Sequence, residues 1–385
     1  MIQFARKNSS LMICIFLTVH ISQAQSVPTQ LDILFHEVST DPQIRFNGVV
    51  LVAGKDSIIY QNATGFSNIS IQQKNSVQTR FQLASLSKVF TAIAIMQLAE
   101  KETIRLDDPL IKYFPAFPYA DITIRQILSH TSGLPDFIEI YREKSSHALN
   151  NSDMIPALIR FGSLQSVPGT NFHYSSIGYA LLANLVEKIS GQSFPEYIQE
   201  HICKPAGMLH SYVLSPYMMH PDSLRAMNYR SHGADLLTSD DSIRTVLESP
   251  WQTIVGPGLM VSSAEDLLLF SEALFANKIL SSETQEEMYT VVKLKDGEDT
   301  KLDRAPIYQS LGWGVDMDQS SGKIVSHNGG SMGISTILLR NLKTHQTVIV
   351  LENTDNMGIL AFGVNAMNIL TGKPVRQFGP PPGRN

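Results

Sequence analysis

The chain has 385 residues, of which 43% are hydrophobic and 17% are charged. It can therefore bury a sizeable core, as two structural units or one large bipartite domain, and it is neither disordered nor fibrous in composition. With 30 lysines and arginines against 35 aspartates and glutamates, the net charge is −5. This balance argues against a nucleic-acid partner, because phosphate binding needs clustered positive charge.

Residues 1–24 have the pattern of a secretory signal peptide. Arg6 and Lys7 precede a mostly apolar run at 11–19, and Ser22-Gln23-Ala24 supplies small residues for a cleavage site. The run is shorter than the roughly 20 residues that cross a bilayer. We therefore expect a secreted or periplasmic mature protein with no stable membrane anchor.

The two cysteines, Cys14 and Cys203, can form neither a disulfide scaffold nor a thiolate zinc site. Cleavage after Ala24 would remove Cys14, and we expect the remaining Cys203 to be buried and inert. No close set of His, Asp and Glu suggests a metal site, so we expect neither a metal nor a cofactor.

Strand patterns lie towards both ends of the mature chain, and helical patterns lie between them. A hairpin is expected within 45–68, and helices are expected at 85–100, 124–129 and 177–189. Strands are expected again at 313–317, 323–326, 336–340 and 347–351, followed by a helix at 357–370. This order predicts an α/β (α+β) fold, in which an antiparallel sheet built from both termini is flanked by helices and holds an inserted all-helical subdomain. Residues 215–255 suggest a long lid-like segment, and 373–385 form a flexible Pro-rich tail.

Ser85 and Lys88 stand three residues apart at the start of the apolar 85–100 helix, and therefore on one helix face. A serine hydroxyl needs a neighbouring base to become a nucleophile, and burial favours the neutral amine that such a base requires. The helix N-terminus adds N–H groups for a developing oxyanion. A capping serine followed by a surface lysine would give the same four-residue pattern.

Two further motifs carry candidate residues. Tyr174, in Tyr174-Ser175-Ser176, lies just before a helix and can carry a proton if a lysine lies beside it, or can simply pack its ring. His327, in His327-Asn328-Gly329-Gly330, follows the strand expected at 323–326, where glycines allow a ligand to approach the backbone. Taken alone, the His327-Asn328-Gly329-Gly330 motif is typical of a turn.

In this order, the three motifs resemble those of the serine β-lactamase and penicillin-binding protein superfamily. The tyrosine is similar to that of the class C β-lactamase branch, with its D-aminopeptidases, D-alanine carboxypeptidases and family VIII esterases. Other stretches typical of this branch are 106–110, 128–135, 256–259 and 262–267. The resemblance covers about residues 45–355 and implies a single hydrolase domain over 25–372.

The resemblance implies roles for particular residues. Ser85 would be the nucleophile, Lys88 its base and Tyr174 the proton carrier to the leaving group. The N–H groups of Ser85 and Gly330 would form the oxyanion hole, and His327, Gly329 and Ser176 would contact the substrate. His130 matches an element outside the three motifs, and we expect it to be a structural histidine in a turn.

Two positions depart from the family pattern. Ser176 stands where Asn is usual, and a serine hydroxyl offers fewer donors to a substrate amide. His327 stands where the β-lactamases have Lys, which removes a permanent charge suited to a substrate carboxylate. Both changes argue against efficient β-lactam hydrolysis.

The sequence therefore predicts a secreted serine hydrolase that forms an acyl-enzyme on Ser85. Its partner would be a small ester or a D-amino-acid peptide, including a cell-wall peptide. Two alternatives stay open at this point. One is a penicillin-binding-like sensor or scaffold that is acylated without turnover, and the other is a true β-lactamase. The oligomeric state is not indicated by any pattern.

Overall fold

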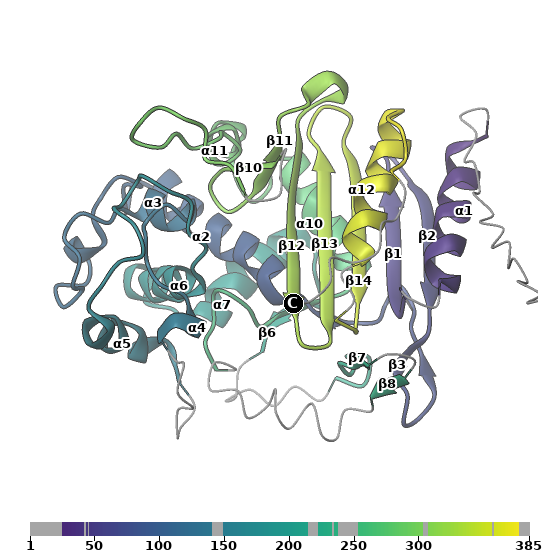
Figure 1. Ribbon diagram of the computed structural model, residues 1–385, viewed down its shortest axis with the longest axis horizontal. Coiled ribbons are helices and arrows are strands. Elements are labelled where there is room, and N and C mark those ends of the chain that lie inside the picture. The colour runs from purple at the N-terminus through teal and green to yellow at the C-terminus, as the bar shows by residue number, and fades with distance from the viewer. Residues whose placement is uncertain are drawn as a thin grey trace, which may run out of the picture.

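A seven-stranded antiparallel sheet joins the two ends of the described chain, with strand order β10-β11-β12-β13-β14-β1-β2 (Figure 1). The first strand, β1 (Gly48–Ala53), lies between β14 (Gln346–Glu352) and β2 (Ile58–Thr64). All six residues of β1 are buried, as expected for a central strand covered on both faces. The predicted sheet built from both termini is confirmed.

The computed structural model describes residues 25–376 apart from 42–43, 45, 141–148, 215–221, 233–234, 238–252, 303–306 and 356–357. The expected signal peptide, most of the expected lid-like segment and most of the expected tail lie outside the described residues. Within the described residues, no helix is both long enough and apolar enough to span a bilayer.

The other strands of the large sheet are β10 (Ile307–Gln309), β11 (Gly314–Asp316), β12 (Ile324–Ser331) and β13 (Ile334–Asn341). Small sheets pair β3 (Phe66–Asn68) with β4 (Gln73–Lys74), β9 (Met260–Ser262) with β5 (Phe81–Gln82) and β6 (Tyr212–Val213), and β7 (Arg230–His232) with β8 (Asp235–Leu237).

One face of the large sheet is covered by the first and last helices, α1 (Val27–Thr40) and α12 (Gly358–Thr371) (Figure 1). The α1 helix begins at Ser26, whose hydroxyl accepts the Thr29 N–H, and it has a proline in its first turn. Its apolar residues recur at helical spacing and pack on the sheet; they are Leu31, Leu34, Phe35 and Val38.

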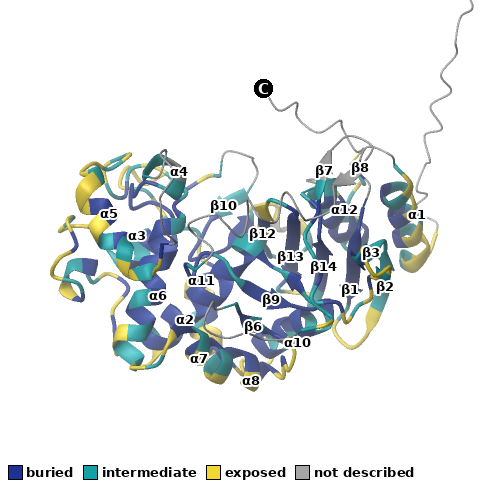
Figure 2. Ribbon diagram, turned by 90° about the horizontal axis from the view of Figure 1, so that it is seen from below, coloured by how far each residue is buried: buried dark blue, intermediate teal, exposed yellow. Residues whose placement is uncertain are grey.

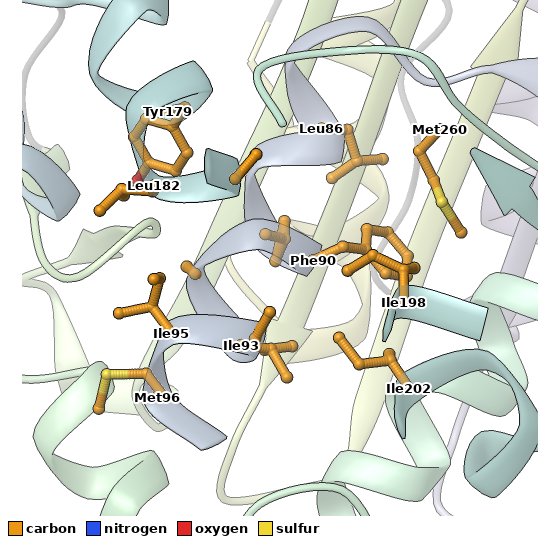
Figure 3. Packing of buried hydrophobic residues seen from close by; sticks show 14 of the residues in the cluster. Leu86, Phe90, Ile93, Ile95, Met96, Tyr179, Leu182, Ile198, Ile202 and Met260 are labelled. Atoms are coloured by element: carbon orange, nitrogen blue, oxygen red, sulfur yellow. The ribbon is translucent and has the colours of Figure 1, made fainter. Parts of the chain in front are cut away.

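The other face is covered by α2 (Lys88–Glu100) and α10 (Ala264–Phe275). From Lys88 to Leu98 every residue of α2 is buried, so this helix runs through the main core. Figure 3 shows how side chains of α2 such as Phe90 and Ile93 meet apolar residues from other helices, including Ile198 and Ile202. The apolar 85–100 segment therefore lies in the core.

The remaining helices gather beside the sheet, where the buried core of the sheet continues into them (Figure 2). They are α3 (Ile124–Leu128), α4 (Phe137–Ile140), α5 (Met154–Phe161), α6 (Ser176–Ser190), α7 (Phe194–Ile198), α8 (Lys204–Ala206) and α11 (Ser282–Met288). The α6 helix ends at Gly191, whose φ of 73° is the left-handed conformation of a helix C-cap. The predicted helical insertion is therefore present.

One strand differs from its prediction. We expected the strand at 323–326 to end before His327, but β12 continues through Ser331. Its residues pair with β13 as far as Ser331 opposite Ile334. Hydrogen bonds to β13 hold the Asn-Gly-Gly segment extended, although these residues by themselves favour a turn.

Candidate active site

Ser85 lies in a short 3-10 turn, Ala84–Ser87, that leads directly into α2. The preceding residue, Ala84, has a φ of 46°, which is uncommon for a residue other than glycine. Non-glycine residues in such conformations concentrate at functional sites. The turn places the Ser85 hydroxyl 3.1 Å from Nζ of Lys88, so the two residues form a hydrogen-bonded pair.

Lys88 is fully buried beneath this turn. Its Nζ donates to the carbonyl oxygen of Pro257 at 3.0 Å and lies 4.8 Å from the centre of the Tyr174 ring. In the described part of the chain, no carboxylate forms an ion pair with Lys88. A buried amine held by a hydroxyl and a carbonyl oxygen is well placed to exchange a proton with the serine.

Tyr174 precedes Ser175, which is the N-cap of α6. The Ser175 hydroxyl accepts the Gly178 N–H and donates to the carbonyl oxygen of Pro135. This fixed helix start positions Tyr174, whose ring contacts both Lys88 and the imidazole of His130.

A cavity of about 270 Å³ brings most of the candidate residues together. It is lined by Ser85, His130, Phe172, Tyr174, Leu302, Ile307, Gln309, Gly314, Ser326, His327, Asn328 and Gly330. The residues of the first motif, the second motif and β12 thus meet around one space. Ser85 and Gly330, the two expected donors to an oxyanion, both face it.

His327 is partly buried in β12, and its Nδ1 lies 2.8 Å from the carbonyl oxygen of Asn328. A carbonyl only accepts, so Nδ1 carries the proton and Nε2 of the neutral ring is an acceptor. Burial, with the nearby positive charge of Lys88, lowers the pKa of His327 to about 4. The imidazole is therefore uncharged at neutral pH.

Ser176 and Gly329 are not among the residues that line this cavity. Ser176 is the first residue of α6, and its N–H donates to the Asp136 carboxylate at 2.8 Å. Gly329 lies against the carbonyl oxygen of Leu83, close to the nucleophile turn. Their expected contacts with substrate stay predictions.

Sequence reasoning missed several residues of the site. The carbonyl oxygen of Pro257 accepts a hydrogen bond from Lys88. The carbonyl oxygen of Gly256 accepts one from Thr91, which lies in α2 like Lys88. The 256–259 stretch is typical of the class C branch, but its sequence alone indicates no role for it. Leu302, Ile307 and Gln309 follow no pattern that would have marked them as lining residues.

Cys203 is buried, and burial raises the pKa of its thiol to about 12, so this cysteine has the inert character expected of it. Among the described residues, no group of three His, Cys, Asp or Glu side chains is arranged to hold a metal ion.

The sequence matches known proteins over most of its length. A family model described as "Beta-lactamase" matches residues 37–360. The chain is 33% identical to penicillin-binding protein 4* of Bacillus subtilis over 318 residues, which are 81% of this chain and 69% of that protein. It is 29% identical to the putative penicillin-binding protein PbpX of the same species over 64% of this chain and 60% of that one.

The fold also matches that of solved protein structures. A penicillin-binding protein from Bacillus halodurans has a TM-score of 0.70 at 25% identity, covering 88% of this chain and 98% of that one. The D-amino acid amidase of Ochrobactrum anthropi SV3, at 21% identity, has a TM-score of 0.74 over 89% of this chain and 99% of that one. This second likeness concerns the fold alone.

The fold, the hydrogen-bonded Ser85–Lys88 pair and the relatives together define a serine hydrolase. The chain belongs to the beta-lactamase family. The chain spans 60–69% of the length of the two Bacillus subtilis relatives.

Proposed function

We propose that the protein is a secreted hydrolase that forms an acyl-enzyme on Ser85 and cleaves an ester or a D-amino-acid peptide or amide bond. The observation that carries this proposal is the 3.1 Å hydrogen bond between Ser85, which lines the cavity, and a fully buried Lys88. A serine that only caps a helix beside a surface lysine would not account for this burial.

In this proposal the Ser85 oxygen attacks the substrate carbonyl carbon while its proton passes to Lys88. The backbone N–H groups of Ser85 and Gly330 stabilise the negative charge on the carbonyl oxygen. Tyr174 then delivers a proton to the departing alcohol or amine, which leaves an ester on Ser85. Water hydrolyses this ester by the reverse proton movements and releases the acid.

The polar groups beside the cavity support a substrate without a carboxylate near the scissile bond. His327 has no charge at neutral pH, and its Nε2 is an acceptor that would repel a carboxylate oxygen. Esters place no charge there, and neither do amides or peptides without a free carboxylate beside the scissile bond. A penicillin-binding protein, a D-amino acid amidase and the hydrolase EstCE1 have this fold, which is consistent with this range of substrates.

A panel of p-nitrophenyl esters, D-alanyl peptides and nitrocefin, offered to the purified protein, tests the proposal. We expect multiple turnovers on an ester or D-peptide and little on nitrocefin. Acylation without turnover would instead support a sensor or scaffold, and rapid nitrocefin hydrolysis would support a true β-lactamase.

Export is the remaining part of the proposal and rests on the pattern of residues 1–24. The mass of the intact protein isolated from its native compartment tests it. We expect a chain that begins at Gln25. A mass that retains residues 1–24, or that includes a lipid on Cys14, would contradict export as a free protein.

A further inference from the structure

His130 is bonded to the residues on both sides of Tyr174. Its carbonyl oxygen accepts the His173 N–H at 2.7 Å, and its ring Nδ1 accepts the Ser175 N–H at 3.1 Å. One residue, 44 positions earlier in the chain, therefore fixes the backbone immediately before and after the tyrosine.

The imidazole of His130 also stacks on the Tyr174 ring, with centres 4.4 Å apart and planes inclined by 27°. Tyr179, whose hydroxyl donates to the carbonyl oxygen of Leu128, lies 5.1 Å from the same imidazole. The backbone of Tyr174 and one side of its ring are thus held by His130, while Lys88 lies over the ring.

The hydrogen bond from Ser175 fixes the tautomer of His130. Since Nδ1 accepts the hydrogen bond from the Ser175 N–H, the neutral ring carries its hydrogen on Nε2. Nε2 is buried and has no hydrogen-bond partner among the described residues. Burial, with the charge of Lys88, lowers the pKa of His130 well below its usual value, which preserves the acceptor at Nδ1. His130 therefore acts on Tyr174 through its ring face and Nδ1, with no relay through Nε2.

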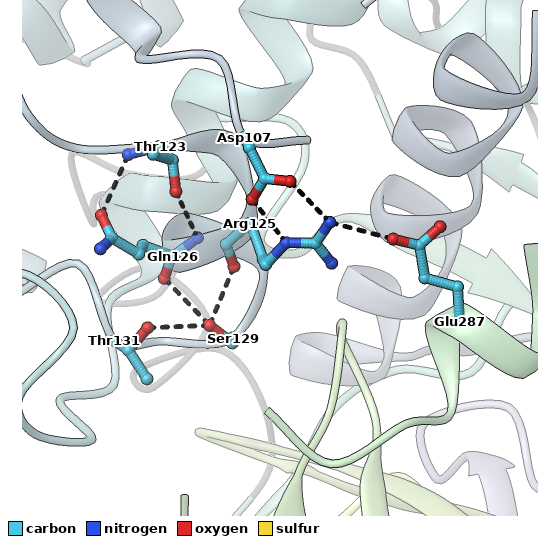
Figure 4. Close-up of polar contacts among 7 residues, drawn as sticks. All are labelled: Asp107, Thr123, Arg125, Gln126, Ser129, Thr131 and Glu287. Atoms are coloured by element: carbon cyan, nitrogen blue, oxygen red, sulfur yellow. Dashed lines mark hydrogen bonds and ion pairs between the residues drawn. The ribbon is translucent and has the colours of Figure 1, made fainter. Parts of the chain in front are cut away.

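The turn that carries His130 is held in an uncommon conformation. Its φ of 55° lies in the left-handed region, which is a strained position for most residues other than glycine. Figure 4 shows the polar network around this turn, in which the Ser129 hydroxyl contacts the carbonyl oxygens of Arg125 and Gln126 and the hydroxyl of Thr131.

Further contacts tie this network to the rest of the molecule. Arg125 pairs with Asp107 and with Glu287, and Thr123 forms a capping box with Gln126 at the start of α3 (Figure 4). The network holds the residues on both sides of His130, whose ring contacts the tyrosine. Strain at one residue, supported by bonds from several elements, is typical of functional sites.

We propose that His130 is a positioning residue, which fixes the ring and backbone of Tyr174 so that the tyrosine hydroxyl meets Lys88 and the leaving group. The inference rests on the proposed function, because it assumes that Tyr174 carries a proton. His130 itself makes no contact with the reacting atoms in this account.

Two substitutions separate the contacts. His130→Phe keeps a ring to stack on Tyr174 but removes the acceptor for the Ser175 N–H. His130→Asn removes the ring, while its side-chain oxygen can still accept a hydrogen bond and asparagine tolerates the left-handed conformation. We expect each to lower kcat about 10- to 100-fold, since small displacements of a catalytic group have effects of this size, with KM changed by less than about threefold.

The deciding comparison places each substitution in a Tyr174→Phe background. If His130 acts through the tyrosine hydroxyl, the double variants should be no slower than Tyr174→Phe alone within about threefold. A role confined to folding would lower kcat by the same factor in both backgrounds and would overturn the inference, as would unchanged kcat in the single variants. Should His130→Phe fail to fold, His130→Asn gives the same comparison.

His345 provides a matched control. It also has a left-handed φ, of 54°, and its ring stacks on Phe275 with centres 4.3 Å apart, in the turn between β13 and β14. His345→Asn and His345→Phe should leave kcat unchanged. Wild-type kcat in Tyr174→Phe would contradict the role of Tyr174 in the proposed function, whereas a slow Tyr174→Phe with additive His130 losses would contradict only the inference about His130.

Discussion

Gly329 of β12 lies against the carbonyl oxygen of Leu83, so closely that a Cβ atom built on Gly329 would come within 2.0 Å of it. The same carbonyl accepts a hydrogen bond from Thr336 in the neighbouring strand, at 2.9 Å. Leu83 is two residues before Ser85. This contact therefore sets how close β12, with Gly330 and His327, comes to the nucleophile.

Gly329→Ala should push β12 away from Ser85, because no room exists for the added methyl group. Overpacking of this kind typically destabilises a protein by about 1–3 kcal/mol. Displacing the Gly330 N–H from the oxyanion should lower kcat about 10²-fold or more. Urea unfolding and ester hydrolysis, measured on the same preparation, check the two effects.

Gly191→Ala is the control for Gly329→Ala. Gly191 has a left-handed φ, and nothing lies within 4 Å of a Cβ added there. The strained backbone should lower stability by about 1–2 kcal/mol without lowering kcat. If Gly329→Ala loses only as much activity as Gly191→Ala, the contact with Leu83 is not what positions the oxyanion donors.

Tyr174→Phe removes only the hydroxyl and keeps the ring that packs on His130 and Lys88. We expect kcat to fall about 10²-fold or more, the usual contribution of a general acid or base. The decline should be greatest for substrates with poorly departing groups, such as amides, because these need the proton most. Near wild-type rates on both amides and activated esters would reduce Tyr174 to a packing residue.

Substrate preference tests the departures at Ser176 and His327. Losing one neutral hydrogen bond typically costs about 0.5–1.5 kcal/mol, and losing one to a charged group about 1.5–3 kcal/mol. Together these would disfavour β-lactams by roughly 30- to 1,600-fold relative to a site with asparagine and lysine, while an ester would escape most of this loss. The ratio of kcat/KM for nitrocefin to that for a short p-nitrophenyl ester measures this preference.

The double substitution Ser176→Asn with His327→Lys should raise that ratio, and each single change should raise it less. Because Ser176 is not among the cavity-lining residues, we expect most of the gain to come from His327→Lys. A wild-type protein that prefers nitrocefin, or a double variant with an unchanged ratio, would contradict this account of specificity.

Glu352 gives a prediction for stability against pH. It is fully buried at the end of β14, where it accepts hydrogen bonds from the Asn47 N–H at 3.2 Å and the Thr354 hydroxyl at 2.5 Å. Burial raises the pKa of this carboxyl well above its usual value of 4.5. The folded state therefore binds its proton more tightly than the unfolded state, and the resulting stability is lost as the pH rises from about 4.5 towards the folded-state pKa.

Glu352→Gln removes this titration while keeping the shape of the side chain. Relative to wild type, the variant should therefore be more stable at pH 8 than at pH 5. Urea unfolding at the two pH values checks the prediction. An equal difference between the proteins at both values would show that Glu352 does not titrate as its burial implies.

Local patterns were sufficient to predict the main frame of the molecule. The buried 48–53 strand, the apolar 85–100 helix and the strands at 336–340 and 347–351 all lie where composition and periodicity placed them. The α1 helix was not predicted, although Ser26, a proline in its first turn and apolar residues at helical spacing are signals that could have revealed it.

The parts that could not be predicted depend on contacts between residues far apart in the chain. Pairing with β13 keeps His327 and Gly329 in a strand, against the local preference of Asn-Gly-Gly for a turn. The bond from Lys88 to Pro257 joins positions 169 residues apart. No periodicity encodes such contacts, and the resemblance to a family supplied the roles of the motifs rather than this geometry.

Covalent labelling of Ser85 tests the central claim most directly. After exposure to a fluorescent phosphonate, we expect the wild-type protein to gain one label, which peptide mapping places on Ser85, and the Ser85→Ala variant to gain none. Ser87→Ala is the matched control, because the Ser87 hydroxyl accepts the Met260 N–H and lies outside the cavity-lining set. It should be labelled at Ser85 like wild type. A Ser85→Ala variant that is still labelled, or a wild-type label on another residue, would contradict an acyl-enzyme on Ser85.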